Sequence, residues 1–298
     1  MGLHVCFVPE MTSVALIRFY DNESGGHRGL FLILPPFIRR SWKGKGGELD
    51  RHNQKIIAII PAAGAGVRME TNRPKQFLDL DGSPVLVRTL EVFQECPAID
   101  SIILITPDQD VEYARKEIVH TYGLTKVEKV VPGGERRQDS VRLGLEAWEG
   151  HDGLVLIHDG VRPLVPADLI VRAIDAAKEN RAVIPALPAK ETVKEVNENA
   201  LVVKTYDRRK IWLVQTPQVF RYQDILMAHQ RAIKENWEEV TDDALLMEKV
   251  GIPVKVIEGS EDNIKVTTPR DMELARFLLK ERTAACAARA TAFQETGE

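Results

Sequence analysis

Cysteine is scarce in this chain of 298 residues: only Cys6, Cys96 and Cys286 are present, and no two of them have the CxxC spacing. This scarcity argues against a disulfide framework and against a cysteine-bound zinc site, and it fits a reducing compartment. Long apolar runs are missing as well. The longest run near the start, residues 30–38, is interrupted by two prolines, and no stretch has the length needed to span a membrane.

An excess of charge of one sign is also lacking, because the net charge is only −4. A chain with this balance has no general attraction for nucleic acid, so any polyanionic ligand must be met by a local cluster of basic side chains. Apolar residues make up 44% and charged residues 28% of the sequence, which is typical of a soluble globular enzyme. We therefore expect a cytoplasmic protein with no nucleic-acid and no membrane partner.

Residues 1–54 lack a sustained period and end in the glycine- and lysine-rich stretch SWKGKGGE. They fit three hypotheses: an organelle-targeting peptide, an accessory segment with its own partner, or an over-extended gene model. The acidic residues Glu10 and Asp21 argue against a targeting peptide. We favour the third hypothesis, in which this extension is disordered or not part of the working protein, which begins just before Lys55.

From residue 55 to residue 282 short apolar runs alternate with amphipathic segments of helical length. The runs at 56–60, 101–105, 126–131, 153–157 and 182–186 are typical of buried parallel strands, and the segments at 84–95, 109–120, 135–148 and 167–179 of helices. This alternation predicts an α/β fold with a doubly wound, mostly parallel sheet. In such sheets the loops at the carboxyl ends of the strands hold the ligand.

The stretch 187–210 breaks the alternation and predicts two short strands joined by a turn at residues 197–199. A hairpin standing out from a domain is marginal by itself, so we expect it to pack against a second copy of the chain. The last residues, 283–298, are predicted to be a frayed tail.

The first predicted strand leads directly into the glycine- and alanine-rich loop PAAGAGVRM, residues 61–69. Small residues let the backbone N–H groups of such a loop approach phosphate oxygens, and Arg68 and Lys75 add positive charge nearby. The loop is not a dinucleotide fingerprint, since Met69 stands where the third glycine belongs, nor a Walker loop, since no Gly-Lys-Ser/Thr closes it. A plain turn with solvated basic side chains is the alternative interpretation.

Two further predicted strands end in loops with polar or small residues. After residue 131, Gly133 and Gly134 can bring backbone amides against a ligand, and Ser140 lies in the first turns of the next helix. After residue 157, Asp159 is suited to hold a divalent cation together with nucleotide phosphates, and Arg162 is suited to bind a phosphate. Helix capping is the alternative role for Ser140.

His158 precedes Asp159, and we expect it to have a structural role.

The segment GSEDNIKVTTPRD, residues 259–271, predicts a short strand before the last helix. Lys265 and Asp262 lie three residues apart in it, with an ordinary surface lysine as the alternative interpretation. Thr268 followed by Pro269 is typical of an N-cap and the first position of a helix, so we assign this pair no chemistry.

Taken together, these segments resemble the 2-C-methyl-D-erythritol 4-phosphate cytidylyltransferase family of the non-mevalonate isoprenoid pathway. The motifs occur in the order and spacing of that family: PAAGAGVRM, PKQF, GGERRQDSV, HDGVRP, TYDRRKIW, LVQTPQVF, VTDDA and DNIKVT. The resemblance spans roughly residues 55–281 and does not cover the extension or the tail. The joint match is far more specific than any single motif.

The resemblance implies a Rossmann-like nucleotidyltransferase fold with a dimerisation arm, and transfer of CMP from CTP to 2-C-methyl-D-erythritol 4-phosphate with Mg²⁺. It implies that Arg68 and Lys75 neutralise the triphosphate and the transition state, and that Arg208 and Lys265 also belong to the catalytic set. The implied CTP pocket consists of Ala62, Ala63, Gly64, Gly134 and Ser140. The implied acceptor site consists of Asp159, Arg162, Thr192, Arg208 and Lys265.

Other implied roles are less direct. Asp159 is the candidate metal ligand, and Asp262 is a weaker second candidate. Thr192 and Arg208, on the arm at about 187–210, are expected to serve the partner subunit's site in a homodimer. Thr216 and Thr241 match motif positions without a defined role.

Two departures from the family pattern keep alternatives open. Gly160 and Val161 replace the two alanines of the usual HDAARP, and Val67 stands where a basic residue is frequent. A pentitol-phosphate cytidylyltransferase, such as one acting on ribitol 5-phosphate, therefore remains an alternative with another acceptor. From other classes, we considered a catalytically inactive nucleotide-binding module and a nicotinamide-dependent oxidoreductase; Met69 argues against the oxidoreductase.

Overall fold

The computed structural model describes residues 17–18, 31–32, 54–64, 74–150, 152–238 and 240–296, and it describes side chains for those of them between residues 54 and 285. The chain divides into two units, residues 1–52 and 53–298. In the first unit, β1 (Ile17–Arg18) pairs with β2 (Phe31–Leu32) in antiparallel orientation. The remaining elements all belong to the second unit.

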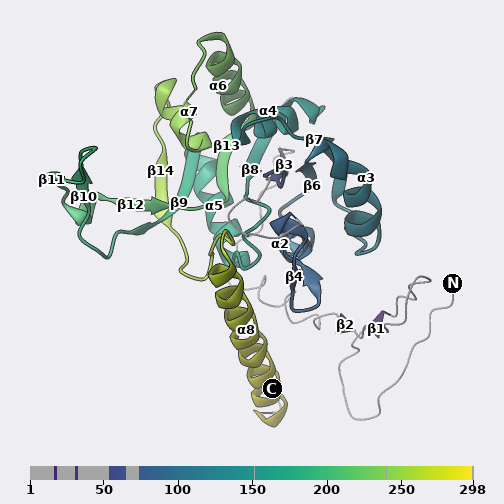
Figure 1. The fold of residues 1–298 in the computed structure, drawn as a ribbon. Coiled ribbons are helices and arrows are strands. Elements are labelled where there is room, and N and C mark those ends of the chain that lie inside the picture. The colour runs from purple at the N-terminus through teal and green to yellow at the C-terminus, as the bar shows by residue number, and fades with distance from the viewer. Residues whose placement is uncertain are drawn as a thin grey trace. The chain divides into compact units, whose positions relative to one another are not determined.

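The second unit is built on a mixed sheet of eight strands, in the order β12-β9-β13-β8-β3-β6-β7 with β14 beside β9 (Figure 1). The strands are β3 (Lys55–Pro61), β6 (Ser101–Thr106), β7 (Val127–Pro132), β8 (Gly153–Ile157), β9 (Ala182–Pro188), β12 (Trp212–Val214), β13 (Gln218–Arg221) and β14 (Lys255–Glu258). Neighbouring strands from β8 to β7 are parallel, whereas β13 runs antiparallel to both of its neighbours. The five predicted strands and the mostly parallel sheet are confirmed.

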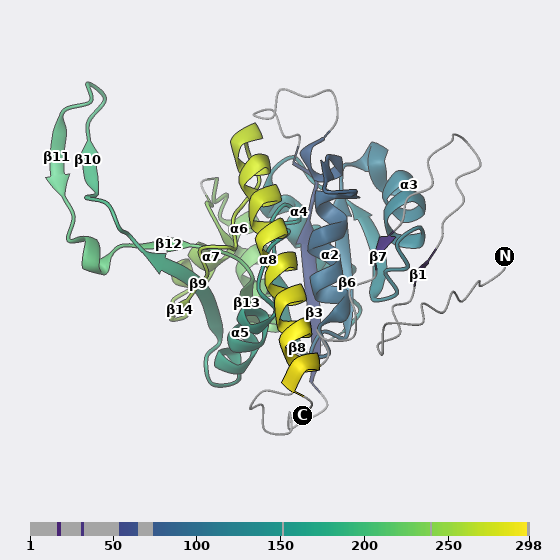
Figure 2. The ribbon, with the colours of Figure 1, turned by 90° about the horizontal axis from the view of Figure 1, so that it is seen from below.

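Helices cover both faces of this sheet, because the side chains of each buried strand point alternately to the two sides. On one face, α4 (Arg137–Ala147), α6 (Tyr222–Lys234) and α7 (Asp243–Lys249) pack against Ile57 and Ile59 of β3 in one apolar cluster. On the other face lie α2 (Val85–Glu95), α5 (Ala167–Glu179) and α8 (Pro269–Thr296) (Figure 2). The doubly wound arrangement follows from this alternation.

The smaller elements connect the sheet to its helices. They are a 3₁₀ turn at Lys75–Phe77, a hairpin of β4 (Asp79–Leu80) and β5 (Ser83–Pro84), a 3₁₀ turn at Asp108–Asp110, α3 (Val111–Tyr113), a π-helical segment at Ala114–His120 and a 3₁₀ turn at Arg208–Lys210. The helix predicted over 109–120 is therefore divided between α3 and the π-helical segment. No helix in the described part of the chain is both long and apolar enough to cross a membrane.

The predicted hairpin is present as β10 (Lys194–Val196) paired with β11 (Val202–Thr205), and it stands out from the domain (Figure 2). Its turn forms where it was expected, because the Asn197 side chain accepts hydrogen bonds from the backbone N–H groups of Asn199 and Leu201. The hairpin exposes large apolar side chains, with Leu201 63% and Val203 61% exposed. We call residues 187–210 the arm.

Two local predictions were wrong. The short strand expected within 259–271 does not form: β14 lies earlier, and the Gln215 side chain instead bonds the backbone N–H and C=O of Ser260. These are the backbone groups that a neighbouring strand would otherwise bond. The frayed tail expected at 283–298 is a helix up to Thr296, since α8 continues through an alanine-rich segment of high helix propensity.

Candidate functional site

The loops that follow β3, β7 and β8 meet at the carboxyl edge of the sheet, where a backbone hydrogen bond fixes each loop to the end of a neighbouring strand. The N–H of Ala62 donates to the C=O of Ile105 at 2.7 Å, and the N–H of Gly133 donates to the C=O of Thr106 at 2.8 Å. In the loop after β8, the N–H of Gly160 donates to the C=O of Pro61 at 3.1 Å. Three predicted ligand loops thus form one surface.

Gly133 is required for the close approach of two of these loops. A Cβ at this position would lie 2.4 Å from the Cβ of Ala63 and 2.9 Å from Oγ of Ser140. Ser140 is buried on α4, where its hydroxyl accepts a hydrogen bond from the N–H of Gly134 at 3.1 Å and donates to the C=O of Arg136 at 3.2 Å. Ser140 therefore shapes the glycine loop and also lines the cavity described next.

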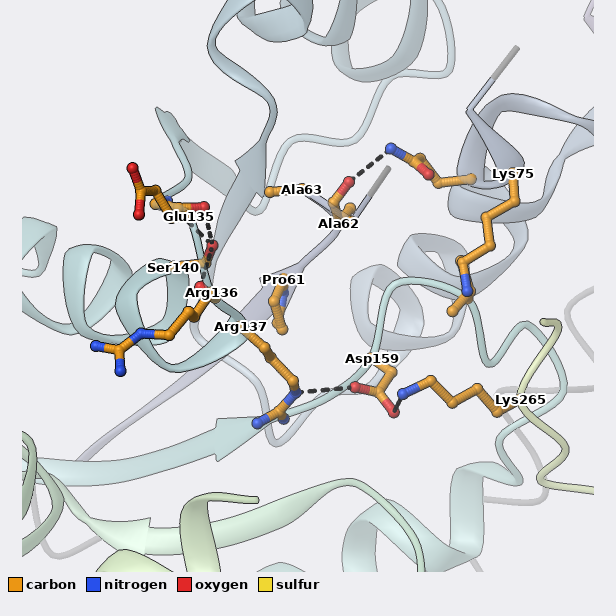
Figure 3. Close-up of a pocket in the computed structure, with 14 residues that line it drawn as sticks. Pro61, Ala62, Ala63, Lys75, Glu135, Arg136, Arg137, Ser140, Asp159 and Lys265 are labelled. Carbon is orange, nitrogen blue, oxygen red and sulfur yellow. Dashed lines mark hydrogen bonds and ion pairs between the residues drawn. The ribbon is translucent and has the colours of Figure 1, made fainter. Parts of the chain in front are cut away.

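A cavity of about 220 Å³ opens between the loops. Figure 3 shows the side chains of Lys75, Asp159 and Lys265 around it, together with that of Arg137. Its lining includes all five residues of the predicted CTP pocket, namely Ala62, Ala63, Gly64, Gly134 and Ser140. The predicted residues of four separate sequence segments are thus brought to one site.

Asp159 lies at the centre of a cluster of positive charges and is only 6% exposed. Its Oδ1 is 3.3 Å from Nε of Arg137, and its Oδ2 is 3.2 Å from Nε of Arg162 and 3.1 Å from Nζ of Lys265. Burial raises the pKa of this carboxyl, but the three positive charges, led by that of Arg137, outweigh burial and hold the pKa well below its usual range. The carboxylate is therefore ionised at neutral pH.

His158 supports the same loop from the protein interior, as the sequence indicated. Its Nδ1 lies 3.0 Å from the hydroxyl of Thr216, and its Nε2 lies 3.4 Å from the C=O of Arg162. The Thr216 hydroxyl also accepts a hydrogen bond from the N–H of Asp159 at 3.2 Å. Burial lowers the pKa of His158 to about 3, so the ring is neutral and structural.

Lys265 is presented by a loop that is tied to the rest of the site through buried polar groups. Arg162 donates from Nη1 to the C=O of Asn263 at 2.7 Å, and Asn263 donates from Nδ2 to the C=O of Thr216 at 2.7 Å. The N–H of Val266 donates to the C=O of Val161 at 2.9 Å. Arg162 is buried, so in this structure it joins the Asp159 and Lys265 loops to one another.

A second cavity, of about 390 Å³, adjoins the first, since Arg137, Asp159 and Lys265 line both. Arg162, Thr216 and Thr241 line it as well, which gives the two threonines a position at the site. The two cavities thus meet at Asp159.

Three predicted residues lie away from both cavities, and a fourth, Arg68, falls outside the described residues. Thr192 and Arg208 are exposed on the arm and line neither cavity, and Arg208 donates a hydrogen bond to the C=O of Lys190 at 2.8 Å. Asp262 is also exposed and lines neither cavity, so the metal hypothesis rests on Asp159.

Sequence reasoning missed Arg137 and Gln76. Arg137 lines both cavities and bonds Asp159, but it follows Arg136 directly, and the sequence does not tell which of the two faces inward. Gln76 donates from Nε2 to the C=O of Ala62 at 2.7 Å and so fixes the first loop. Its position beside Lys75 in the PKQF motif was the signal that could have identified it.

Comparison with known proteins agrees with this arrangement. A family model for 2-C-methyl-D-erythritol 4-phosphate cytidylyltransferase (IspD) matches residues 56–281. A relative of that name from Syntrophus aciditrophicus is 47% identical over 227 residues, which cover 76% of this chain and 97% of the relative. One from Geobacter metallireducens is 45% identical over 230 residues, 76% of this chain and 98% of the relative.

Solved structures show the same likeness. The crystal structure of 4-diphosphocytidyl-2C-methyl-D-erythritol synthase from Anaerococcus prevotii aligns with a TM-score of 0.67 and 35% identity, covering 76% of this chain and 96% of that chain. The Francisella tularensis 2-C-methyl-D-erythritol 4-phosphate cytidylyltransferase aligns with a TM-score of 0.64 and 35% identity, over 75% of this chain and 99% of that chain. This chain belongs to the 2-C-methyl-D-erythritol 4-phosphate cytidylyltransferase family.

Proposed function

We propose that this protein transfers CMP from CTP to 2-C-methyl-D-erythritol 4-phosphate, forming 4-diphosphocytidyl-2-C-methyl-D-erythritol and pyrophosphate. Family membership supports the reaction. The observation that carries the proposal for this chain is the meeting of Lys75, Asp159 and Lys265 around one cavity, beside the loops of small residues.

The chemical step is an in-line displacement at the α-phosphorus of CTP. An oxygen of the acceptor's phosphate forms the new P–O bond, and the bond from the α-phosphorus to the bridging oxygen breaks, so that pyrophosphate leaves with that electron pair. The acceptor phosphate is already an anionic nucleophile, so the reaction requires no general base. Repulsion between the two anions is the main obstacle, worth about 4 kcal/mol per pair of unit charges about 4 Å apart at an effective dielectric of about 20.

Fixed positive charges at this site can offset the repulsion between the two phosphate groups. Lys75 lines the cavity from the 3₁₀ turn at Lys75–Phe77, and Lys265 lines it from the segment before α8, 3.1 Å from Asp159. We infer that Lys75, with Arg68, neutralises the triphosphate, whereas Lys265 binds the acceptor phosphate. The backbone N–H groups of Ala63 and Gly64 are suited to hold the nucleotide, whereas those of Ala62 and Gly134 bond Ile105 and Ser140 and fix the shape of the loops.

The residues also fit a Mg²⁺ ion that arrives on the triphosphate. Among the described residues no group of three or more His, Cys, Asp or Glu side chains could hold a metal ion by itself. Mg²⁺ at nucleotide sites commonly uses one or two carboxylates together with substrate phosphates, and Asp159 is an ionised carboxylate at the cavity. We infer that Asp159 would hold the ion, which supplies further positive charge at the α-phosphate when bound.

The acceptor site is completed, in our proposal, by a second copy of the chain. The arm carries Thr192 and Arg208 away from the cavities of its own subunit, and it exposes apolar side chains that a partner would cover. A homodimer formed through the arm would bring these two residues to the partner's acceptor phosphate. Because the reaction consumes CTP, we expect the enzyme to act in the cytoplasm.

An acceptor panel tests the proposed reaction. Pyrophosphate release is measured with CTP and one acceptor at a time: 2-C-methyl-D-erythritol 4-phosphate, ribitol 5-phosphate, or none. We expect release with the first acceptor only, and NADH absorbance provides a control for oxidoreductase activity. A preference for ribitol 5-phosphate would establish the pentitol alternative, and no release with either would favour an inactive module. The names of the relatives reported above disfavour both outcomes.

A further inference from the structure

Arg137 is held between two buried carboxylates, and only one of them lines the cavities. Its Nε lies 3.3 Å from Oδ1 of Asp159, and its Nη1 lies 2.7 Å from Oδ2 of Asp243. Asp243 is 1% exposed and is not among the residues lining either cavity. Asp243 is therefore placed behind the cavities, and Arg137 is the cavity-lining residue that its carboxylate bonds.

A third buried group completes this cluster. Nε2 of His229 lies 3.3 Å from Oδ1 of Asp243, and both side chains are almost fully buried. The three residues come from different helices: Arg137 begins α4, Asp243 begins α7 and His229 lies within α6. The cluster thus joins the helices of one face of the sheet to the loop that carries Asp159.

The guanidinium of Arg137 controls how Asp159 is presented. A planar guanidinium can bond two carboxylates at fixed angles, which an ammonium group cannot do. With Oδ1 engaged by Arg137, the other oxygen of Asp159 faces Lys265 and Arg162. If Arg137 were released from Asp243, its side chain, which is 30% exposed, could turn into the cavity and leave Asp159 in another orientation.

We propose that Asp243 is a positioning residue for the reaction: it fixes Arg137, which in turn sets the orientation of Asp159 between the two cavities. This inference rests on the proposed function, since Asp159 is the carboxylate to which we assign the cation. Asp243 itself contacts neither substrate. Residues that hold a metal-binding side chain in its orientation, without contacting the metal themselves, commonly change metal affinity or activity by roughly 10–100-fold when they are substituted.

The test compares Asp243→Asn, Arg137→Lys and their combination with the full-length wild type. Turnover is measured as pyrophosphate release at saturating substrates. CTP binding without acceptor is measured by calorimetry in MgCl₂ and in EDTA, which gives a readout independent of turnover. Tyr222→Phe is the matched control: its hydroxyl donates to the C=O of Leu145 at 3.1 Å, so it also joins α6 to α4 but does not touch Arg137.

We expect Asp243→Asn to lower kcat roughly 10–100-fold and to reduce the gain in CTP affinity that Mg²⁺ provides by about 10-fold. CTP affinity in EDTA and the binding stoichiometry should stay at the wild-type values. Arg137→Lys should give the same losses, and the combined variant should lose no more than Arg137→Lys alone. Tyr222→Phe should lower the midpoint of thermal unfolding and leave kcat and CTP affinity at the wild-type values.

Three results would overturn the inference: wild-type kcat and Mg²⁺ dependence in Asp243→Asn, losses that multiply in the combined variant, or equal losses in Tyr222→Phe. If Asp243→Asn does not fold, Asp243→Glu replaces it in the same comparison: this variant keeps the negative charge but displaces the carboxylate from Arg137, so the same losses are expected and wild-type behaviour would overturn the inference. Absence of pyrophosphate release by the wild type would contradict the proposed function, whereas the calorimetric comparison would still test the positioning role.

Discussion

At the scale of single residues, the site depends on charges that are held in place by buried neighbours. Asp159 stays ionised because Arg137, Arg162 and Lys265 surround it. The neighbouring His158 is kept neutral by burial, with its pKa at about 3. The two adjacent titratable residues thus have different roles. Asp159 is charged and lines the cavity, whereas His158 is neutral and supports the loop from the protein interior.

The burial of neutral His158 predicts a contribution to acid sensitivity. Its folded pKa of about 3 lies below the ordinary value of 6.5, so between these values the unfolded state binds a proton that the folded state does not. Stability is therefore lost as the pH falls below about 6.5, at about 1.4 kcal/mol per pH unit for this residue.

The His158→Gln variant should remove this dependence. Urea unfolding of the variant and the wild type between about pH 4 and about pH 6 should give slopes of unfolding free energy against pH that differ by about 1.4 kcal/mol per unit. The slope, and not the absolute stability, is the quantity to compare, because the substitution also changes packing. Parallel lines for the two proteins would show that His158 is not buried in its neutral form.

At the scale of elements, the glycine loop after β7 depends on a close approach that only glycine permits. Gly133→Ala would place a Cβ 2.4 Å from that of Ala63 and 2.9 Å from Oγ of Ser140, so the two loops would have to separate. We expect the affinity for CTP, measured by calorimetry, to fall by about 10-fold or more, which corresponds to a loss of at least about 1.4 kcal/mol of binding free energy.

A compensating variant makes this prediction specific. Ala63→Gly combined with Gly133→Ala removes the closer of the two clashes and should restore part of the affinity. If the single variant bound CTP as the wild type does, the two loops would not share the nucleotide. If the double variant were no better than the single one, the contact with Ala63 would not be the cause.

The arm allows a prediction about assembly. Val202 and Val203 are adjacent on β11 and are 59% and 61% exposed. Successive strand residues point to opposite faces, so changing both to glutamate places charge on each face of the hairpin. We expect light scattering to give the mass of a dimer for the wild type and of a monomer for the double variant, with acceptor use lost. A dimeric double variant would place the subunit interface elsewhere.

Much of the fold was predictable from the sequence because buried parallel strands are short, continuous apolar runs. The elements that were missed lack such a signal. The strand β14 is largely exposed and has only two apolar residues between two charged ones, and in the segment that follows it Ser260 is bonded by the side chain of Gln215. Likewise, Arg137 and Asp243 each follow a residue of identical type, so only the direction of the helix start decides which of the two faces inward.

At the scale of the whole molecule, the match to the family covers residues 56–281 and does not include the first unit of the chain, residues 1–52. We propose that residues 55–282 are the working enzyme. A protein that lacks residues 1–54 should keep the wild-type kcat and KM for both substrates in the pyrophosphate assay. A large loss of activity on deletion, in a protein with an unchanged circular dichroism spectrum, would assign the extension a part in the reaction.

The central claim is that fixed cations at one edge of the sheet bring two repelling phosphate groups together. Lys75→Ala tests it most directly, with Lys178→Ala as the control, since Lys178 pairs with Asp175 on the surface of α5. The measurement is kcat for pyrophosphate release at saturating CTP and acceptor. We predict a fall of about 10²–10³-fold for Lys75→Ala, with an unchanged thermal midpoint and no effect of Lys178→Ala. A kcat for Lys75→Ala near that of the wild type would contradict the account.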